Sequence, residues 1–303
     1  MNQKIEQEFI NILGEENVHV DEPMKEHTTF RIGGPADFFL TPGNWEELSG
    51  ILNICAVEKL PYFILGNGSN LLVSDKGYRG AIIQIYRNLS DILVEGTLLT
   101  VKAGALLSQV ARKAMEYGLT GFEFAGGIPG TLGGAVVMNA GAYGGEMKDV
   151  LQEVVVLTNE GEVCCLKAED LKLGYRTSII KESGYIVLEA AIRLMPGEKE
   201  KIRERMNELR DRRVSKQPLE YPSAGSTFKR PQGYFAGKLI MDAGLRGFAV
   251  GNAQVSDKHC GFVINNGNAT AEEVRELIRQ IVERVYENSN VTLEPEVKFL
   301  GEF

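Results

Sequence analysis

The chain has 303 residues, 44% of them hydrophobic and 24% charged, which is typical of a globular protein with two or three domains. Its formal net charge of −8 excludes a global basic field for nucleic acid, so an anionic ligand needs local donors. The N-terminal MNQKIEQEF lacks the apolar core of a signal peptide, and no apolar run approaches the ~18 residues of a membrane span. We therefore expect a cytoplasmic protein that binds neither nucleic acid nor membrane. We also expect a monomer, although nothing in the composition determines the oligomeric state. The four cysteines form no CxxC pair, which predicts no disulfide framework.

Hydrophobic periodicity predicts alternating helices and strands in the first part of the chain. The expected elements are a helix on the Ile5–Leu13 stripe, an extended segment at 27–34, a strand at 37–41, a helix at 45–58, strands at 61–65, 71–73, 81–85, 92–94 and 99–101, and a helix from 106 to about 118. A loop at 66–70 follows the strand at 61–65.

The second part of the chain begins with a loop at 125–145 that holds eight glycines in 21 residues. Further on, Thr270 and Glu273 form a capping-box pattern in front of an amphipathic helix. The other expected elements are strands at 154–157, 163–166 and 186–192, a charged helix around 202–209, and an extended segment at 291–303. The mixture predicts an α+β fold, with two lobes at 1–78 and 79–215 that form a nucleotide-binding region, a smaller domain at 216–290 and a C-terminal strand at 291–303 that returns to the first region.

The first glycine loop contains small residues that let the main chain turn tightly and point N–H groups at an anion. It lacks the lysine of a P-loop, and Leu71 stands where a Rossmann fingerprint has its third glycine. A plain turn between strands is the alternative. The candidate ligand-binding residues here are Gly66, Asn67, Gly68, Ser69, Asn70 and Leu71.

The second glycine loop is too costly in backbone entropy to be idle filler. Its glycines remove side chains where a ligand must approach closely, although tight strand packing is an alternative reason for them. Two such loops indicate a dinucleotide pyrophosphate bound outside a Rossmann fold. The candidate residues are Gly127, Ile128, Pro129, Gly130, Thr131, Gly133, Gly134, Asn139, Ala140 and Gly141.

The two loops resemble the FAD pyrophosphate loops of the vanillyl-alcohol-oxidase-type (PCMH-type) flavoproteins. GNGSNLL followed by GIPGTLGGAVVMNAGAYG resembles the UDP-N-acetylenolpyruvoylglucosamine reductase family, and the resemblance runs from about residue 27 to 301. It implies a two-lobed FAD-binding region with a smaller α+β substrate domain, non-covalent FAD, and NADPH as co-substrate. It further implies that an enolpyruvyl ether of UDP-N-acetylglucosamine is reduced to UDP-N-acetylmuramate for peptidoglycan.

Three polar residues stand in short motifs that match this family: Arg176 in GYRTS, Ser226 in SAGSTFKRP and Glu296 in LEPEV. The resemblance implies hydride transfer from flavin N5 to C3 of the enolpyruvyl group and protonation at C2. Arg176 then stabilises the developing enolate, Ser226 donates the proton and Glu296 polarises the substrate. Taken singly, these residues are also compatible with a surface ion pair, a turn and a solvated strand.

Other residues are weaker candidates for contacts with the substrate or the cofactor. Lys216 and Lys229 are expected near the substrate's phosphates and Arg31 near FAD, with surface charges and a turn as the alternatives. Tyr143 packs either beside the flavin or in the core. The histidines and Cys260 form no metal-ligand pattern, so we expect no metal. The short chain resembles the loop-lacking type II form of the family, in which residues 234–239 are candidates to close over the substrate.

Two other function classes share some of these features. An oxidase or dehydrogenase of the same flavin fold often holds FAD covalently through His, Cys or Tyr, but no His or Cys stands beside either glycine loop. A non-catalytic UDP-sugar or flavin sensor keeps the glycine loops and has no need for the three polar residues together.

Overall fold

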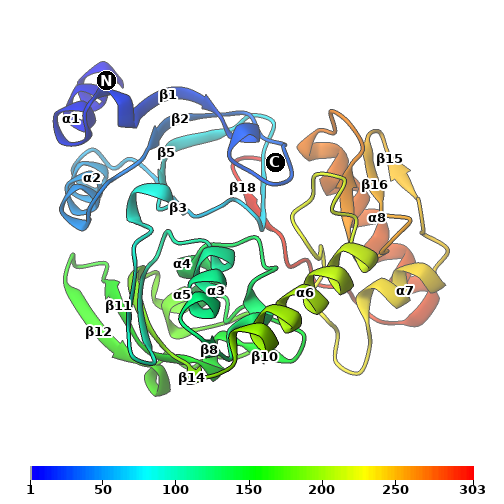
Figure 1. Cartoon of the computed structure of the whole chain (residues 1–303). Helices are drawn as coiled ribbons and strands as arrows, with labels where there is room; N and C mark the ends of the chain where they lie inside the picture. The colour runs from blue at the N-terminus through cyan, green and yellow to red at the C-terminus, as the bar shows by residue number, and fades with distance from the viewer. Residues whose placement is uncertain (1) are drawn as a thin grey trace. The chain divides into compact units, whose positions relative to one another are not determined.

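The computed structural model describes residues 2–303, and the chain forms two compact units (Figure 1). The first unit comprises Met1–Val18, Leu40–Asn67 and Ile82–Arg213, and the second His19–Phe39, Gly68–Ala81 and Val214–Phe303. The last change of unit lies two residues before the predicted start of the substrate-binding domain at 216. Residues 19–39 and 68–81 belong to the second unit, an assignment that the sequence did not predict.

A five-stranded antiparallel sheet forms the centre of the first unit. Its strands follow from the alternation of buried and partly exposed side chains. In β7, for example, Leu99 and Val101 are buried and their neighbours are not. A tight turn at Gly96, with φ of 60°, joins β6 to β7. The strand order is β12 (Val163–Lys167), β11 (Leu151–Leu157), β13 (Ile186–Arg193), β7 (Leu98–Lys102) and β6 (Ile92–Glu95).

Helices complete this unit. Helix α1 (Asn2–Leu13) packs on α2 (Trp45–Val57), and α4 (Leu132–Val137) contacts β13 and β7. Strand β3 (Tyr62–Leu65) neighbours β5 (Tyr78–Gln84), within which the chain passes from the second unit into the first. The remaining elements are α3 (Leu107–Glu116), α5 (Ile179–Ser183), α6 (Lys199–Lys216, which ends in the second unit), β8 (Leu119–Thr120), β9 (Gly141–Ala142), β10 (Gly145–Glu146) and β14 (Met195–Pro196).

The second unit has its own apolar core, in which Leu277, Ile281 and Val285 are fully buried. These residues lie on one face of α8 (Ala271–Ser289), which packs against α7 (Ala236–Asp242), β15 (Ala249–Val250) and β16 (Ala253–Val255). Strand β16 lies between β15 and β17 (Val263–Asn265), and β2 (Pro35–Leu40) lies next to β1 (Val18–Pro23). Strand β18 (Lys298–Leu300) pairs in parallel with β4 (Leu71–Val73), which directly follows the first glycine loop.

Helix α8 begins where the sequence predicts it. The Thr270 hydroxyl accepts the N–H of Glu273, and the Glu273 carboxylate accepts the N–H of Thr270, at 3.1 and 3.0 Å. The carboxylate of Asp75 also accepts the N–H groups of Ala271 and Glu272, at 2.8 and 3.1 Å. Because these donors have no partner inside the helix, the Thr270 hydroxyl and the two carboxylates satisfy the N–H groups of its first turn.

Two local predictions were wrong. The segment 27–34 is not extended: the Thr28 hydroxyl donates to the carbonyl of Ile32, and Arg31 is left-handed with φ of 54°, so the chain turns. The second glycine loop is not irregular throughout, because Leu132–Val137 forms α4 inside it. Most of the other predicted helices and strands are present, with small shifts at their ends.

No helix within residues 2–303 is long and apolar enough to cross a membrane. The same residues contain no cluster of three or more His, Cys, Asp or Glu side chains that could hold a metal ion. Cys55 and Cys260 are buried and their thiols are free. Burial raises the pKa of the Cys55 thiol to about 12, so this thiol is unreactive at neutral pH.

Candidate active site

The two glycine loops meet within the first unit. The Asn67 side-chain amide donates to the main-chain carbonyl of Pro129 at 2.6 Å. A Cβ added to Gly66 would lie 2.5 Å from the Thr131 hydroxyl oxygen, so only glycine permits this approach. Thr131 is buried. The structure therefore brings together residues that lie more than 60 positions apart and that the sequence predicted to bind one ligand.

The glycines of the second loop serve two purposes. A Cβ on Gly133 would stand 3.1 Å from the Cβ of Ala103, so this glycine permits close packing, as the alternative interpretation proposed. Gly127 and Gly134, in contrast, are exposed and present bare main chain. The N–H groups of Gly127 and Gly130 donate to no acceptor within residues 2–303. Such donors fit the oxygens of a diphosphate, which makes this loop a suitable cradle for FAD.

The end of the first glycine loop belongs to the second unit, where the Arg31 segment packs on it. A Cβ on Gly68 would lie 2.1 Å from the carbonyl oxygen of His27, and Gly68 has a φ of 60°. The N–H of Thr29 donates to the carbonyl of Gly68 at 3.2 Å. The exposed Arg31 follows directly, and its predicted contact with FAD stays a prediction.

Ser226 and Glu296 stand on neighbouring segments of the second unit. The N–H of Glu296 donates to the carbonyl of Thr227 at 2.8 Å, and the Asn70 side-chain amide donates to the carbonyl of Glu296 at 3.2 Å. The Thr227 hydroxyl is buried and accepts the N–H of Val263 at 2.9 Å, whereas Ser226 is exposed. A glycine-loop residue, a carboxylate and an accessible hydroxyl are thus held by one main-chain network.

Arg176 lies in a tight turn of the first unit. Gly174 and Thr177 exchange two main-chain hydrogen bonds of 3.1 and 3.4 Å around it, and Arg176 has a left-handed φ of 57°. Its guanidinium lies over the Tyr175 ring, 5.2 Å from the centroid. The buried Asn139 donates to the carbonyl of Gly174 at 3.1 Å, which ties this turn to the second glycine loop.

Comparison with known proteins decides the family. A model described as FAD binding domain matches residues 36–167, and one described as UDP-N-acetylenolpyruvoylglucosamine reductase, C-terminal domain, matches residues 217–300. A protein from Agathobacter rectalis that is named UDP-N-acetylenolpyruvoylglucosamine reductase is 54% identical, and the match covers 100% of both chains. A protein of the same name from Lachnoclostridium phytofermentans is 53% identical, and that match covers 100% of this chain and 99% of the relative. The chain belongs to the UDP-N-acetylenolpyruvoylglucosamine reductase family.

Solved structures agree with this family. The crystal structure of UDP-N-acetylenolpyruvylglucosamine reductase from Thermus caldophilus is 38% identical and has a TM-score of 0.81, over 94% of this chain and 100% of that one. A 4-ethylphenol oxidase from Gulosibacter chungangensis, at 17% identity and a TM-score of 0.50, matches 64% of this chain and shares the fold alone. The predicted α+β fold, with a PCMH-type FAD-binding region, is confirmed.

The two lysines expected near the substrate differ in their surroundings. Lys229 forms an ion pair with Glu294, and its N–H donates to the carbonyl of the same residue at 2.9 Å. Lys216, the last residue of α6, is exposed. In this reductase family member, Lys216 is therefore the freer candidate for a phosphate.

The residues that position the candidate site could not be recognised in the sequence. Thr227 has no signal of its own, yet its carbonyl accepts the N–H of Glu296 and its hydroxyl accepts the N–H of Val263. Asn139 was predicted only as a flavin contact. In the structure the Asn139 side chain is fully used by protein groups: it also donates to Glu146 at 2.7 Å and accepts the N–H of Lys148 at 2.9 Å. No sequence pattern reveals such partners, because they are set by the fold. The local signal in the sequence was a single asparagine within a segment of glycine and apolar residues.

Proposed function

We propose that this reductase family member binds FAD without a covalent link and reduces the enolpyruvyl ether of UDP-N-acetylglucosamine to UDP-N-acetylmuramate, with NADPH as the hydride source. The reaction serves peptidoglycan synthesis, and we expect the protein to act as a cytoplasmic monomer. The observation that best supports this proposal is the network in which Asn70 of the first glycine loop holds Glu296, and Glu296 adjoins the Ser226 segment.

The glycine loops are the proposed flavin cradle. Main-chain N–H groups of the two glycine loops would hold the diphosphate. The hydrogen bond from the Asn67 side chain to the carbonyl of Pro129 keeps the two loops close together. When bound, FAD supplies a carrier that accepts hydride from NADPH and delivers it to the substrate.

Arg176 is proposed to face the carboxylate of the enolpyruvyl group. Addition of hydride at C3 leaves negative charge at C2 and on that carboxylate. A guanidinium is always protonated and presents a planar pair of donors, so it stabilises this charge as it develops. The strained turn at Gly174–Thr177 orients the side chain in advance.

Ser226 is proposed to donate the proton that C2 requires. A hydroxyl is a weak acid in water, so it acts only when it is held close to the carbon and when neighbouring charge offsets the alkoxide. The exposure of Ser226 leaves its hydroxyl accessible to a substrate. Glu296 is proposed to polarise the substrate and to relay the proton, and Lys216 and Lys229 to contact its phosphates.

A half-reaction experiment tests the proposal. We expect the purified protein to be yellow and to release FAD on denaturation. Under anaerobic conditions NADPH should bleach the flavin, and the enolpyruvyl UDP-sugar should restore its colour. If the reduced flavin reacts rapidly with oxygen but ignores this sugar, the protein is an oxidase of the same fold. A colourless protein that takes up no flavin contradicts the proposal altogether.

A further inference from the structure

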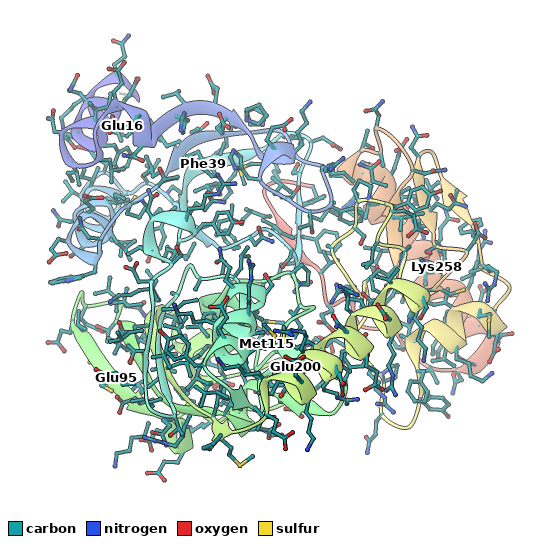
Figure 2. All side chains as sticks on the ribbon, viewed as in Figure 1. Glu16, Phe39, Glu95, Met115, Glu200 and Lys258 are labelled. Carbon is teal, nitrogen blue, oxygen red and sulfur yellow. The ribbon has the colours of Figure 1, made fainter. Side chains whose placement is uncertain are left out.

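Arg213 differs from the other arginines of helix α6. Along this helix the solvent-facing guanidinium groups pair with acids: Arg203 contacts Glu200 at 2.8 Å, and Arg205 contacts Glu208 at 2.5 Å (Glu200 is labelled in Figure 2). Arg213 is half-buried, and within residues 2–303 its guanidinium has no hydrogen-bond or ion-pair partner. Buried charges are normally paired, so a desolvated cation without a partner needs an explanation.

The surroundings of Arg213 belong to the second glycine loop. A Cβ on Gly127 would lie 3.2 Å from Cδ and 3.6 Å from Nη1 of Arg213, so the bare main chain of this loop lies against the guanidinium and its stem. Burial lowers the pKa of the Arg213 guanidinium, and Tyr143 of the same loop acts in the opposite direction. An arginine nevertheless stays protonated at neutral pH, so the loop carries a permanent, partly desolvated positive charge.

The chemistry of this neighbourhood favours an electron-rich ligand. The N–H groups of Gly127 and Gly130 lack acceptors within residues 2–303, and the Arg213 guanidinium lies beside Gly127. A partly desolvated cation without an acceptor costs free energy, and an oxygen ligand that accepts its N–H groups recovers part of that cost. A structural role for the positive charge of Arg213 would require an acceptor in the protein, and the described residues supply none.

We propose that Arg213 is a cofactor-binding residue whose guanidinium donates to oxygen acceptors of the bound flavin. This proposal rests on the FAD binding proposed above. The acceptors are either oxygens of the diphosphate or the C2 carbonyl of the pyrimidine ring, which share the same hydrogen-bond chemistry. The two sources differ in consequence: a cation at the pyrimidine ring stabilises the negative charge of the reduced flavin, whereas one at the diphosphate does not.

The test uses the full-length protein stripped of flavin and titrated with FAD. Arg213→Met keeps the length and packing of the stem and removes the charge. We expect its FAD dissociation constant to rise by about 10- to 100-fold, the range of a hydrogen bond to a charged group. Arg213→Lys should recover part of the affinity. Arg210→Met is the matched control, since Arg210 is exposed on the same helix and forms an ion pair with Asp211. The FAD dissociation constant of this variant should equal that of the unaltered protein.

Two further readouts separate the possibilities. With FAD at saturation, a lowered reduction potential in Arg213→Met assigns the contact to the pyrimidine ring, and an unchanged potential assigns it to the diphosphate. The melting temperature of the flavin-free variant should not fall, because the substitution removes a desolvated charge that has no protein partner. Unchanged FAD affinity in Arg213→Met, or a melting temperature that falls without loss of affinity, overturns the proposal. If the unaltered protein fails to bind FAD, it is the proposed function that fails.

Discussion

Four of the residues singled out in the sequence adopt left-handed backbone conformations. Arg31, Asn139, Tyr143 and Arg176 all have positive φ, at 54°, 42°, 54° and 57°. This region is uncommon for residues other than glycine, and each instance costs free energy that the surrounding structure must offset. For Asn139 and Arg176 the structure shows the offsetting contacts. The Asn139 side chain donates to the carbonyl of Gly174, and Gly174 and Thr177 exchange two main-chain hydrogen bonds around Arg176. Strain of this kind is expected where a side chain must be aimed in advance.

Asn139 gives a prediction about positioning. In Asn139→Ala the N–H of Lys148 and the carbonyl of Gly174 lose their buried partner, so we expect the free energy of unfolding to fall by about 1–3 kcal/mol. The Gly174–Thr177 turn loosens, so flavin reoxidation by substrate should slow more than flavin reduction by NADPH. Denaturant unfolding and stopped-flow absorbance measure the two effects.

Asn159→Ala is the control for this substitution. The side chain of Asn159 is exposed and donates to the carbonyl of Ser183 at 2.8 Å. Because water can replace this bond, its loss should change the free energy of unfolding by less than about 0.5 kcal/mol. Equal effects of the two substitutions would refute the positioning role of Asn139.

His259 gives a prediction about pH. Burial lowers the pKa of this imidazole below its usual 6.5, and Nδ1 accepts the N–H of Gly261 at 3.0 Å, which requires the neutral ring. Between the folded and unfolded pKa values the unfolded chain binds more protons, so the free energy of unfolding falls as the pH drops below about 6.5. One proton limits the slope to about 1.4 kcal/mol per pH unit.

Urea unfolding at a series of pH values measures this slope. His259→Gln keeps an acceptor for Gly261 and cannot titrate, so its stability should depend less on pH between about 6.5 and 5. The same slope in both proteins would assign the effect to another group.

At the scale of elements, Gly68 of the first glycine loop and Gly96 of the β6–β7 turn form a matched pair for substitution. Gly68 and Gly96 share a φ of 60°, so alanine at either position costs about 1–2 kcal/mol of backbone strain. At Gly68 the new Cβ also meets the His27 carbonyl at 2.1 Å, whereas at Gly96 nothing lies within 4 Å. We expect Gly68→Ala to lose a further ~1–3 kcal/mol and most of its FAD affinity. Flavin fluorescence and thermal unfolding test this, and equal FAD affinity in the two variants would contradict the role of the loop.

The sequence predicted elements whose signals are local. The capping box at Thr270 and the apolar stripe behind it located α8, and alternation located β7. Helix α4 was not predicted, because Gly133 and Gly134 disfavour helix and the segment owes its form to contacts with β7 and β13. The ion pair of Lys229 with Glu294 could not be predicted from the sequence either, because 65 positions separate the two residues.

At the scale of the whole molecule, contacts between distant segments decide the division of the chain. Residues 19–39 and 68–81 join the second unit because β4 pairs with β18 and because the side chain of Asn265 donates to the carbonyl of Phe30 at 3.2 Å. Periodicity within one segment carries no information about such pairings. The site residues could be named from their motifs alone, but the contacts that hold them required the fold.

The central claim is that a flavin held by the glycine loops delivers hydride to a substrate that Ser226 protonates. Transient kinetics of Ser226→Ala, with each half-reaction followed separately, tests it most directly. Ser223→Ala is the control, because Ser223 lies in the same motif and contributes only its main-chain groups to the contacts with Thr29. We predict near-normal flavin reduction by NADPH in both variants, and reoxidation by the enolpyruvyl UDP-sugar slowed by about 10²–10⁴-fold in Ser226→Ala alone. Equal loss in both half-reactions, or reoxidation at the normal rate, would contradict the claim.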